Sequence, residues 1–325
     1  MRRPGEGEES GEEGSYVLNR YLNYSNVCIL NCQFCAFARK KREPGTFELS
    51  VEEMTETARK SVAEGITEIH IVGGLHPSLP YSFYLGMLRS LSALRPSPVL
   101  KVFTAIEIRH LAERVAKKPI PEVLADLKEA GLGSLTGGGA EIFDAGVRDR
   151  ICRGKETGEE WLEVHRIWHG MGGRSTATML YGHVETPEQR VEHLERLRDL
   201  QGETGGFTGF VPFAFEPSQT RLADLGKIRR VSSLEELRVI AASRLILDNF
   251  DHITAYWIST GLPLAQVALS YGADDLHGTI EEEKIFHMAG AKTPSGQTRE
   301  SMVRVIREAG REPMQRNTFY EPVEK

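Results

Sequence analysis

The chain has 325 residues, of which 40% are hydrophobic and 26% charged, a balance typical of a folded globular protein. A formal net charge of −6 provides no basic field for nucleic acid or an anionic membrane surface, and no stretch approaches the roughly 20 apolar residues of a membrane span. We therefore expect a small-molecule substrate and neither a nucleic-acid nor a membrane partner. Three of the four cysteines lie within eight positions, which argues against a disulfide framework and favours a reducing cytoplasm.

Predicted strands and helices alternate along most of the chain. Residues 1–14 are rich in Glu and Gly and lack the apolar segment of a secretory signal, so they predict a disordered leader. Ser50 followed by Glu53 has the spacing of a capping box and predicts the start of the first helix. Strands are expected over 15–22, 68–72, 99–104, a short segment before 136, 175–181, 207–213 and 253–257. Helices are expected over 50–64, 80–94, 120–130, 155–171, 187–203, 233–249 and 262–271, and 272–325 is expected to hold a short strand, two helices and a polar tail.

About seven or eight strand–helix alternations predict a parallel sheet. Their number and the length of the chain favour a single α/β domain over 15–325, a closed (β/α)8 TIM-type barrel with a C-terminal helical segment. An open, doubly wound sheet is the alternative. In such barrels the chemistry lies where strands pass into the following loops, and the motifs described below fall at such positions.

Three cysteines, Cys28, Cys32 and Cys35, follow the first predicted strand with CxxxCxxC spacing. Cysteine thiolates are the usual ligands of iron–sulfur clusters, and three of them leave one iron of a 4Fe-4S cluster without a protein ligand. Radical S-adenosylmethionine (SAM) chemistry needs such an open iron, which the amino and carboxylate groups of SAM chelate. The alternatives are chance clustering or a zinc site, but zinc usually takes four ligands and the nearest histidine, His70, lies 35 residues beyond Cys35.

Two features accompany this loop. Cys152 has no second cysteine near it and is expected to be a buried structural residue. The basic run 39–42 is interpreted as a solvated helix end, and the alternative is a local positive field that favours a reduced cluster or an anionic substrate.

Several residues are candidates for holding SAM. Phe34, between the second and third cysteines, is placed to pack beside the adenine. Gly73 and Gly74 end a predicted strand and let the backbone approach a ligand such as the SAM amino group, although a tight turn is the alternative. Glu141 follows a triple glycine that lacks the features of a phosphate-binding loop. We expect Glu141 to bind the ribose hydroxyls or the ammonium of SAM, or else to be an exposed loop residue.

A further group of candidates lies at the ends of other predicted strands. Tyr181 offers a ring to a purine, and Gly182 permits backbone contact. His183 titrates near neutrality and can act as an acid, a base or a hydrogen-bond donor. His76 and Glu107 occupy similar positions. We expect His183, His76 and Glu107 to serve catalysis on the substrate side, with a structural role as the alternative for each.

Long segments of the chain resemble the aminofutalosine synthase family of radical SAM enzymes, which acts in the futalosine route to menaquinone. The matches lie between Asn23 and Tyr320 and include NVCILNCQFCAF, TEIHIVGGLHPSLPYSFY, FTAIEI, GGGAEIFDAGVRDRIC and TMLYGHVETPEQRVEHL. The cyclic dehypoxanthine futalosine synthase and the synthase of the F420 deazaflavin share the cysteine loop, the GG pair and GGGAE. The segments IVGGLHP, FTAIEI and YGHVET favour the aminofutalosine family over these relatives.

The resemblance implies a transferase reaction that consumes SAM. A 5′-deoxyadenosyl radical adds to the vinyl carbon of 3-[(1-carboxyvinyl)oxy]benzoate, the aryl group migrates from oxygen to carbon, and carboxylate is lost to give 6-amino-6-deoxyfutalosine. By position, Cys28, Cys32 and Cys35 match the cluster ligands, and the GG pair, Glu141 and Tyr181 fall where SAM is held. A reductant such as flavodoxin or ferredoxin is the implied partner.

Four positions depart from the pattern of that family. Thr136 replaces a proline, Gly202 an aspartate, Glu216 a histidine and His277 an aspartate. We expect these departures to leave SAM cleavage intact and to bear on the choice of substrate.

Overall fold

The structure, a computed structural model, describes residues 13–226 and 228–323. The predicted leader lies outside the described residues except for Glu13 and Gly14, which begin the first strand. The strands are β1 (Glu13–Val17), β2 (Asn19–Leu22), β3 (Glu68–Ile71), β4 (Val99–Val102), β5 (Ser134–Leu135), β6 (Arg174–Tyr181), β7 (Phe207–Ala214), β8 (Asp275–Gly278) and β9 (Glu312–Arg316). The helices are α1 (Val51–Ala63), α2 (Tyr81–Ser92), α3 (Ala105–His110), the π-helix η1 (Leu111–Ala116), α4 (Ile120–Ala130), α5 (Ala145–Ile151), α6 (Gly158–Gly170), α7 (Pro187–Thr204), α8 (Arg221–Gly226), α9 (Ser233–Ile246), α10 (Trp257–Thr260), α11 (Leu262–Ala268), α12 (Ile285–Ala289) and α13 (Arg299–Glu308).

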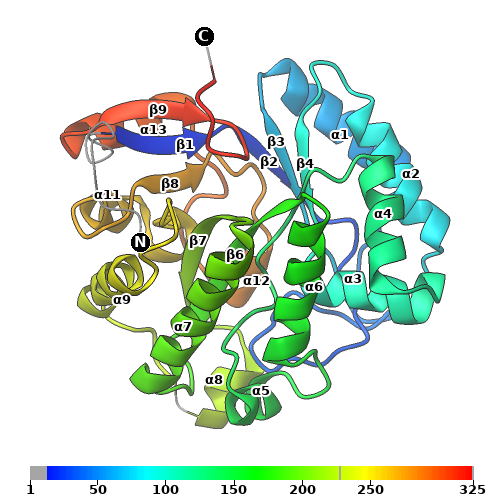
Figure 1. Ribbon diagram of the computed structural model, residues 1–325, viewed down its shortest axis with the longest axis horizontal. Coiled ribbons are helices and arrows are strands. Elements are labelled where there is room, and N and C mark those ends of the chain that lie inside the picture. Colours follow the sequence, from blue (N-terminus) through cyan, green and yellow to red (C-terminus); the bar gives the residue numbers. More distant parts are fainter. Residues whose placement is uncertain (1–12, 227, 324–325) are drawn as a thin grey trace.

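Parallel strands form the wall of a barrel (Figure 1). Six of them pair in the order β2-β3-β4-β5-β6-β7, and a second sheet has the order β8-β1-β9. Isolated parallel bridges join Phe210 to Ile253 and Thr254 to Asp275. Pairing therefore continues from β7 through residues 253–254 to β8 and then to β1, which leads into β2. The predicted α/β barrel is confirmed, with a regular six-stranded arc and a closing side held by single bridges.

The closing side differs from the sequence-based expectation in two ways. The strand expected over 253–257 is reduced to the two bridging residues, because α10 already begins at Trp257 and the N–H of Ile253 bonds to the Asp274 side chain instead of a neighbouring strand. In addition, β9 near the end of the chain pairs in parallel with β1, on the side opposite β8.

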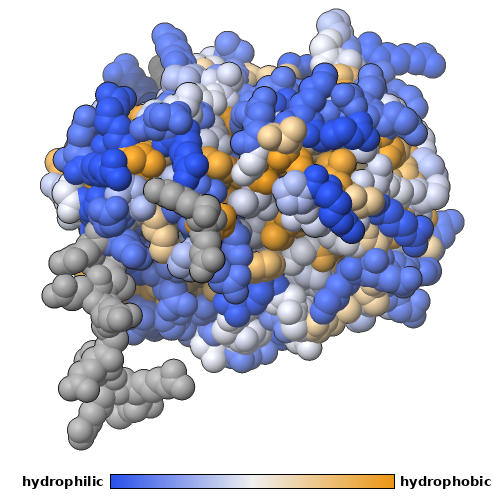
Figure 2. All heavy atoms as spheres, turned by 90° about the horizontal axis from the view of Figure 1, so that it is seen from above, coloured by the Kyte–Doolittle hydropathy of each residue, from blue (hydrophilic) through white to orange (hydrophobic). Residues whose placement is uncertain are grey.

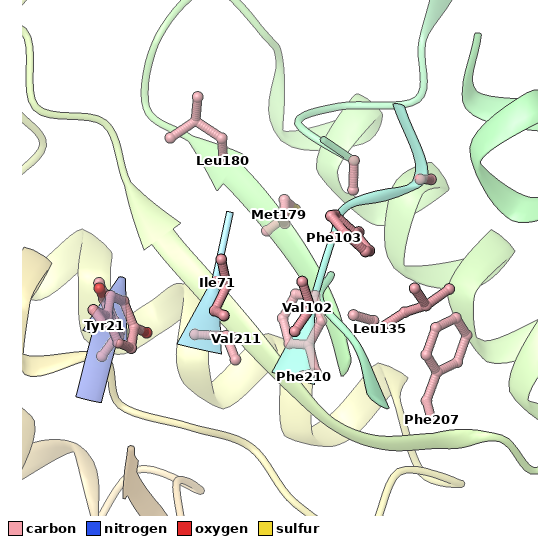
Figure 3. Close-up of a cluster of buried hydrophobic side chains, with 14 of the residues drawn as sticks. Tyr21, Ile71, Val102, Phe103, Leu135, Met179, Leu180, Phe207, Phe210 and Val211 are labelled. Carbon is pink, nitrogen blue, oxygen red and sulfur yellow. The ribbon is translucent and has the colours of Figure 1, made fainter. Parts of the chain in front are cut away.

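Helices cover the outer face of the strands (Figure 1). The predicted capping box is confirmed, since Ser50 accepts a hydrogen bond from the Glu53 N–H and Glu53 accepts one from the Ser50 N–H. Successive residues of a strand point to opposite faces, as Met179 and Leu180 of β6 do in Figure 3. Apolar residues at every second position pack against the helices, and the residues between them fill the barrel interior.

The exposed surface is dominated by polar side chains. The face in Figure 2 is mostly hydrophilic, with apolar side chains visible between the charged ones. Among residues 13–226 and 228–323, none of the helices is both long and apolar enough to cross a membrane.

One buried carboxylate connects the segments of the closing side. Asp275 Oδ2 on β8 accepts hydrogen bonds from Ser15 Oγ of β1 (2.7 Å) and Arg316 Nε of β9 (2.6 Å). Its Oδ1 accepts from Thr254 Oγ1 (2.9 Å) and Arg316 Nη2 (3.0 Å). Burial opposes ionisation of Asp275, but the Arg316 guanidinium and the hydroxyl donors hold its pKa below the usual range. Asp275 therefore fastens β1, β9 and the 253–254 segment to β8.

Replacement of Arg316 tests this connection. Arg316→Met leaves the Asp275 charge buried without its partner, so we expect the free energy of unfolding to fall by about 3–5 kcal/mol. Urea unfolding followed by tryptophan fluorescence measures the loss. The matched control is Arg153→Met, because Arg153 pairs with Asp149 on the exposed surface and its loss should leave the unfolding midpoint unchanged. Equal midpoints for wild type and Arg316→Met would contradict the role given to Asp275.

Candidate functional site

A cavity of about 230 Å³ lies inside the barrel and extends to the loops that follow the strands. Part of its wall is formed by Phe34, Cys35 and Ala36 of the cysteine loop, and part by Gly137, Gly138 and Glu141 of the glycine-rich loop. The remaining lining comes from the inward faces of the strands and from the segment around α12. The cavity therefore connects the cysteine loop with the interior of the barrel.

The cysteine loop occupies the connection between β2 and α1. Its backbone is fixed by Lys40, whose Nζ donates to the carbonyls of Cys28 (2.9 Å), Ile29 (3.1 Å) and Leu30 (2.8 Å). The Cys28 N–H donates to the carbonyl of Arg39 at 3.0 Å. Residues 39–42 thus form no helix end, and the expectation of one was wrong, because their backbone and Lys40 bond to the cysteine loop instead.

The three cysteines of this loop suit a cluster chemically. Each is a free thiol. Burial raises the pKa of the Cys32 and Cys35 thiols, with the charge of Lys155 acting in the opposite direction. Iron binds thiolates, so these cysteines would have to lose their thiol protons to hold a cluster. Cys152 is 2% exposed at the C-terminal end of α5, which agrees with the structural role predicted for it.

The described residues contain no side-chain group that could hold a single metal ion. Within 13–226 and 228–323, no three or more His, Cys, Asp and Glu side chains are arranged to hold one metal ion. A cubane differs from a single ion because each thiolate binds a different iron, and three thiols in one loop match that donor set.

The glycine pair after β3 is required by close approach of the cysteine loop. A Cβ on Gly74 would lie 2.2 Å from the carbonyl oxygen of Val27, next to Cys28, and a Cβ on Gly73 would lie 2.3 Å from the ring of Tyr24. The Gly74 N–H donates to the carbonyl of Ser25 at 2.8 Å. The pair therefore fixes the position of the cysteine loop.

Glu107 is buried behind the glycine pair. Its Oε1 accepts from the Gly73 N–H (3.0 Å) and lies 2.8 Å from the Tyr24 hydroxyl, while Oε2 accepts from the Thr104 N–H (2.8 Å). Burial raises the pKa of Glu107 although these hydrogen bonds oppose the shift. The side chain does not line the cavity, and it joins the start of α3 to the two preceding loops.

The glycine-rich loop winds around a buried arginine that the sequence did not single out. The Arg148 guanidinium donates to the carbonyls of Ala140 (2.6 Å), Ile142 (3.2 Å) and Glu156 (2.8 Å). With its backbone at φ +46°, Glu141 lines the cavity. Its carboxylate pairs with the ammonium group of Lys155.

Lys155 is a second residue that the sequence did not single out. Its Nζ lies 5.7 Å from the centre of the Phe34 ring while it pairs with Glu141. The two SAM candidates Phe34 and Glu141 are therefore brought together at one side of the cavity, and Lys155 connects them.

The Tyr181–Glu185 segment makes its contacts within the protein. His183 Nε2 lies 2.9 Å from the Leu180 carbonyl, and its Nδ1 lies 2.7 Å from the Val184 nitrogen and 2.9 Å from Glu185 Oε2, so both ring nitrogens are engaged within the protein. Burial opposes ionisation of Glu185, but His183 and the N–H groups of Gly182 and His183 lower its pKa to about 2. Tyr181, Gly182 and His183 lie outside the cavity lining, and Glu185, which organises them, was not predicted.

His76 is also held by its own surroundings. Its Nδ1 accepts from the Leu79 N–H (2.9 Å), its Nε2 lies 3.0 Å from Glu48 Oε1, and its carbonyl lies 3.0 Å from His110 Nε2. The side chain is 1% exposed and does not line the cavity. It connects the loop after β3 to the far end of the cysteine loop.

Three of the four departures from the family pattern lie in the cavity wall. These are Thr136, Glu216 and His277, whereas Gly202 lies on α7. Glu216 Oε2 pairs with Arg230 Nη1 at 3.0 Å, and His277 Nε2 lies 2.6 Å from the Tyr21 hydroxyl. The side chains that distinguish this chain therefore surround the space where a substrate can bind.

Polar residues at the floor of the cavity were missed by the sequence analysis. Tyr21, His70 and Lys101 line it from three neighbouring strands, β2, β3 and β4. The signal was present in the EIHI and VLKV segments, where a polar side chain alternates with apolar ones inside a predicted buried strand.

Comparison with known proteins agrees with this architecture. Residues 22–197 match the radical SAM superfamily, and residues 204–325 match the CofH/MqnC C-terminal region. The aminodeoxyfutalosine synthase of Thermus thermophilus is 45% identical over 96% of this chain and 84% of its own length. A 5-amino-6-(D-ribitylamino)uracil–L-tyrosine 4-hydroxyphenyl transferase of Methanopyrus kandleri is 40% identical over 96% and 85%. A cyclic dehypoxanthine futalosine synthase of Streptomyces coelicolor is 39% identical over 94% and 76%.

Among solved structures, the FeFe-hydrogenase maturase HydG of Carboxydothermus hydrogenoformans has the same fold. It superposes with a TM-score of 0.71 over 95% of this chain and 69% of its own, at 16% identity. The family match, the shared fold and the similar proteins all support the same assignment. The chain is an enzyme of the radical SAM superfamily and belongs, within it, to the family of the aminodeoxyfutalosine synthases and their CofH/MqnC relatives.

Proposed function

We propose that this enzyme forms 6-amino-6-deoxyfutalosine from SAM and 3-[(1-carboxyvinyl)oxy]benzoate. The observation that carries the proposal is the 45% identity to an aminodeoxyfutalosine synthase over nearly the whole chain, which includes the cysteine loop and the strands around the cavity. The cavity supports it, because one end is formed by the cysteine loop and the interior offers apolar walls with a polar floor.

In this proposal Cys28, Cys32 and Cys35 hold a 4Fe-4S cluster. When reduced and with SAM bound, such a cluster would supply the electron for cleavage of SAM to a 5′-deoxyadenosyl radical. Lys40 fixes the backbone of the loop by bonding to its carbonyls, and the glycine pair holds the loop against β3. A reductant such as flavodoxin or ferredoxin, in the cytoplasm, delivers the electron.

The residues that face the cavity next to this loop bind SAM in our proposal. Phe34 packs beside the adenine, and Glu141, positioned by Lys155, accepts hydrogen bonds from the ribose or the ammonium group. Gly73 and Gly74 contribute by placing the loop. In our proposal Tyr181, Gly182, His183, Glu107 and His76 support the site from outside, since none of them lines the cavity.

The apolar walls protect a reactive radical. Phe213, Tyr256 and Phe286 form one aromatic group, with ring centres 4.9 Å apart for Phe213–Tyr256 and 5.6 Å for Tyr256–Phe286. Rings of this kind exclude water from the space where an organic radical must add to a double bond and rearrange.

The product of a single anaerobic assay tests the proposed reaction. Reduced, cluster-loaded protein incubated with SAM and the enolpyruvyl benzoate should yield a product with the mass of 6-amino-6-deoxyfutalosine. Formation of only methionine and 5′-deoxyadenosine would contradict the proposal. Turnover only with the substrate of the cyclic synthase or with the ribitylaminouracil and tyrosine pair would assign the chain to one of those relatives instead.

Substitution of single cysteines tests the cluster ligands. Cys28→Ala, Cys32→Ala and Cys35→Ala should each abolish SAM cleavage and lower the iron and sulfide content, because each removes the thiolate of one iron. Cys152→Ala is the matched control, since Cys152 lies at the end of α5 and should not change iron content. Iron analysis and the electron paramagnetic resonance signal of the reduced protein give the readout. One zinc per chain without iron or sulfide would contradict the radical reaction altogether.

The glycine pair provides a separate test of loop placement. Gly74→Ala drives a methyl group against the Val27 backbone, which cannot yield as a side chain can, so we expect a fall in cluster content of several-fold or more. Gly86→Ala on α2 is the control, because a Cβ there meets nothing within 4 Å and alanine favours the helix. A Gly74→Ala protein with full iron content and normal SAM cleavage would show that the close contact is not needed.

A further inference from the structure

The floor of the cavity is a layer of polar side chains set by strand register. Tyr21 on β2 pairs with His70 on β3, and His70 pairs with Lys101 on β4. Residues in register on parallel strands lie side by side, and these three point inward because they line the cavity. The rings of Tyr21 and His70 stack, with centres 4.3 Å apart.

Lys101 is the unusual member of this layer. It is 3% exposed, and within the described residues its ammonium group has an ion pair at 4.0 Å but no hydrogen bond. The nearest anion is Glu68, whose Oε2 lies 4.0 Å from Lys101 Nζ, while Glu68 Oε1 accepts from Asn19 Nδ2 at 3.0 Å. An ammonium group carries three donors, and a buried charged donor without an acceptor is costly. The donors of Lys101 are therefore left for whatever fills the cavity.

His70 provides a second unpaired polar atom at the same place. Its Nδ1 is buried and has no hydrogen-bond partner among the described residues. Burial, and next the charge of Lys101, lower the pKa of His70 to about 3, so the ring is neutral near pH 7. A neutral ring can still offer one N–H to an acceptor.

The other charges near the floor are Glu68 and Arg316, and each lies near an opposite charge. Glu68 faces Lys101, and Arg316 is bound through two hydrogen bonds to Asp275. His277 is engaged through Nε2 with the Tyr21 hydroxyl. Lys101 thus faces Glu68 but makes no hydrogen bond within the described residues; burial lowers its pKa, and the charge of Glu68 opposes that shift.

The walls above the floor are apolar and aromatic. They include Val72, Val211, Leu180 and the aromatic group of Phe213, Tyr256 and Phe286. A ligand that satisfies both parts of this cavity has a flat apolar body and one anionic end.

We propose that Lys101, with His70 beside it, binds the carboxylate of an aromatic carboxylic acid at the floor of the cavity and so determines which substrates are accepted. This inference deepens the proposed function, from which it takes the benzoate substrate class. With its carboxylate at the floor, the ring extends along the apolar walls, and its substituent is left for the end of the cavity formed by Phe34 and Cys35.

A pair of probes of nearly equal shape tests the proposal without turnover. Anaerobic, cluster-loaded protein is titrated calorimetrically with 3-methoxybenzoate and with 3-methoxybenzamide. Wild type should bind the carboxylate at least about tenfold more tightly than the neutral amide, as expected for charge-assisted hydrogen bonds in a buried site. Lys101→Met should bring the two affinities close to each other, and Lys101→Arg should keep part of the preference.

Two further variants separate recognition from folding. Lys101→Met leaves Glu68 as a buried carboxylate without its cation, so the double variant Glu68→Gln/Lys101→Met removes the pair together and should show the same lost preference. Lys60→Met is the matched control, because Lys60 is exposed on α1 and should retain the wild-type preference. Near-ultraviolet circular dichroism reports whether each variant is folded.

The outcomes distinguish this proposal from its competitors. An unchanged carboxylate preference in the folded double variant, or no preference in wild type, would overturn it. L-Methionine is titrated as a third probe, because SAM also carries a carboxylate, and its affinity should not depend on Lys101. Loss of methionine binding with intact benzoate binding would assign Lys101 to the amino acid and also overturn the proposal. Because no probe is turned over, failure to form 6-amino-6-deoxyfutalosine would contradict the proposed function and leave the binding result standing.

Discussion

Closure of the barrel around Asp275 is the constraint on which the rest of the structure depends. The six-stranded arc ends at β7, and within the described residues the pairing crosses to β8 through two isolated bridges and the backbone hydrogen bonds beside them. The Asp275 carboxylate reinforces this short connection, since hydroxyl and guanidinium donors from three other segments converge on it. A buried carboxylate is stable there because Arg316 compensates its charge at hydrogen-bonding distance. This closure also places His277, two residues along β8, against Tyr21 at the floor of the cavity.

The cysteine loop, at the opposite end of the barrel, is also held in place by a few specific contacts. The cysteine loop has almost no regular secondary structure, so its shape depends on contacts from outside it. Lys40 bonds to its carbonyls, and Gly74 allows β3 to approach Val27 closely. Glu107 stabilises this contact from behind by bonding to Gly73. The three cysteines and the cavity wall are therefore positioned by residues that do not line the cavity themselves.

Much of the site was predictable because its motifs are local. Short segments contain the CxxxCxxC spacing, the GG pair and the glycine-rich loop, so adjacent residues are enough to indicate their chemistry. Phe34, Cys35 and Glu141 do line the cavity. His183, His76 and Glu107 were expected on the substrate side because they follow strands. Position after a strand does not fix where a side chain points, and nearby N–H or carbonyl groups bond to His183, to Glu107 and to Nδ1 of His76.

The sequence by itself determined the alternation of strands and helices, the barrel class and the cysteine loop, because periodicity, capping and motif spacing are properties of neighbouring residues. Only the tertiary structure decided how the barrel closes and what lies at its floor. Asp275 and Arg316 are 41 positions apart, and Tyr21, His70 and Lys101 come from three strands separated by long helical connections. Such residues meet only through strand register, which depends on the packing of the whole sheet rather than on any one segment.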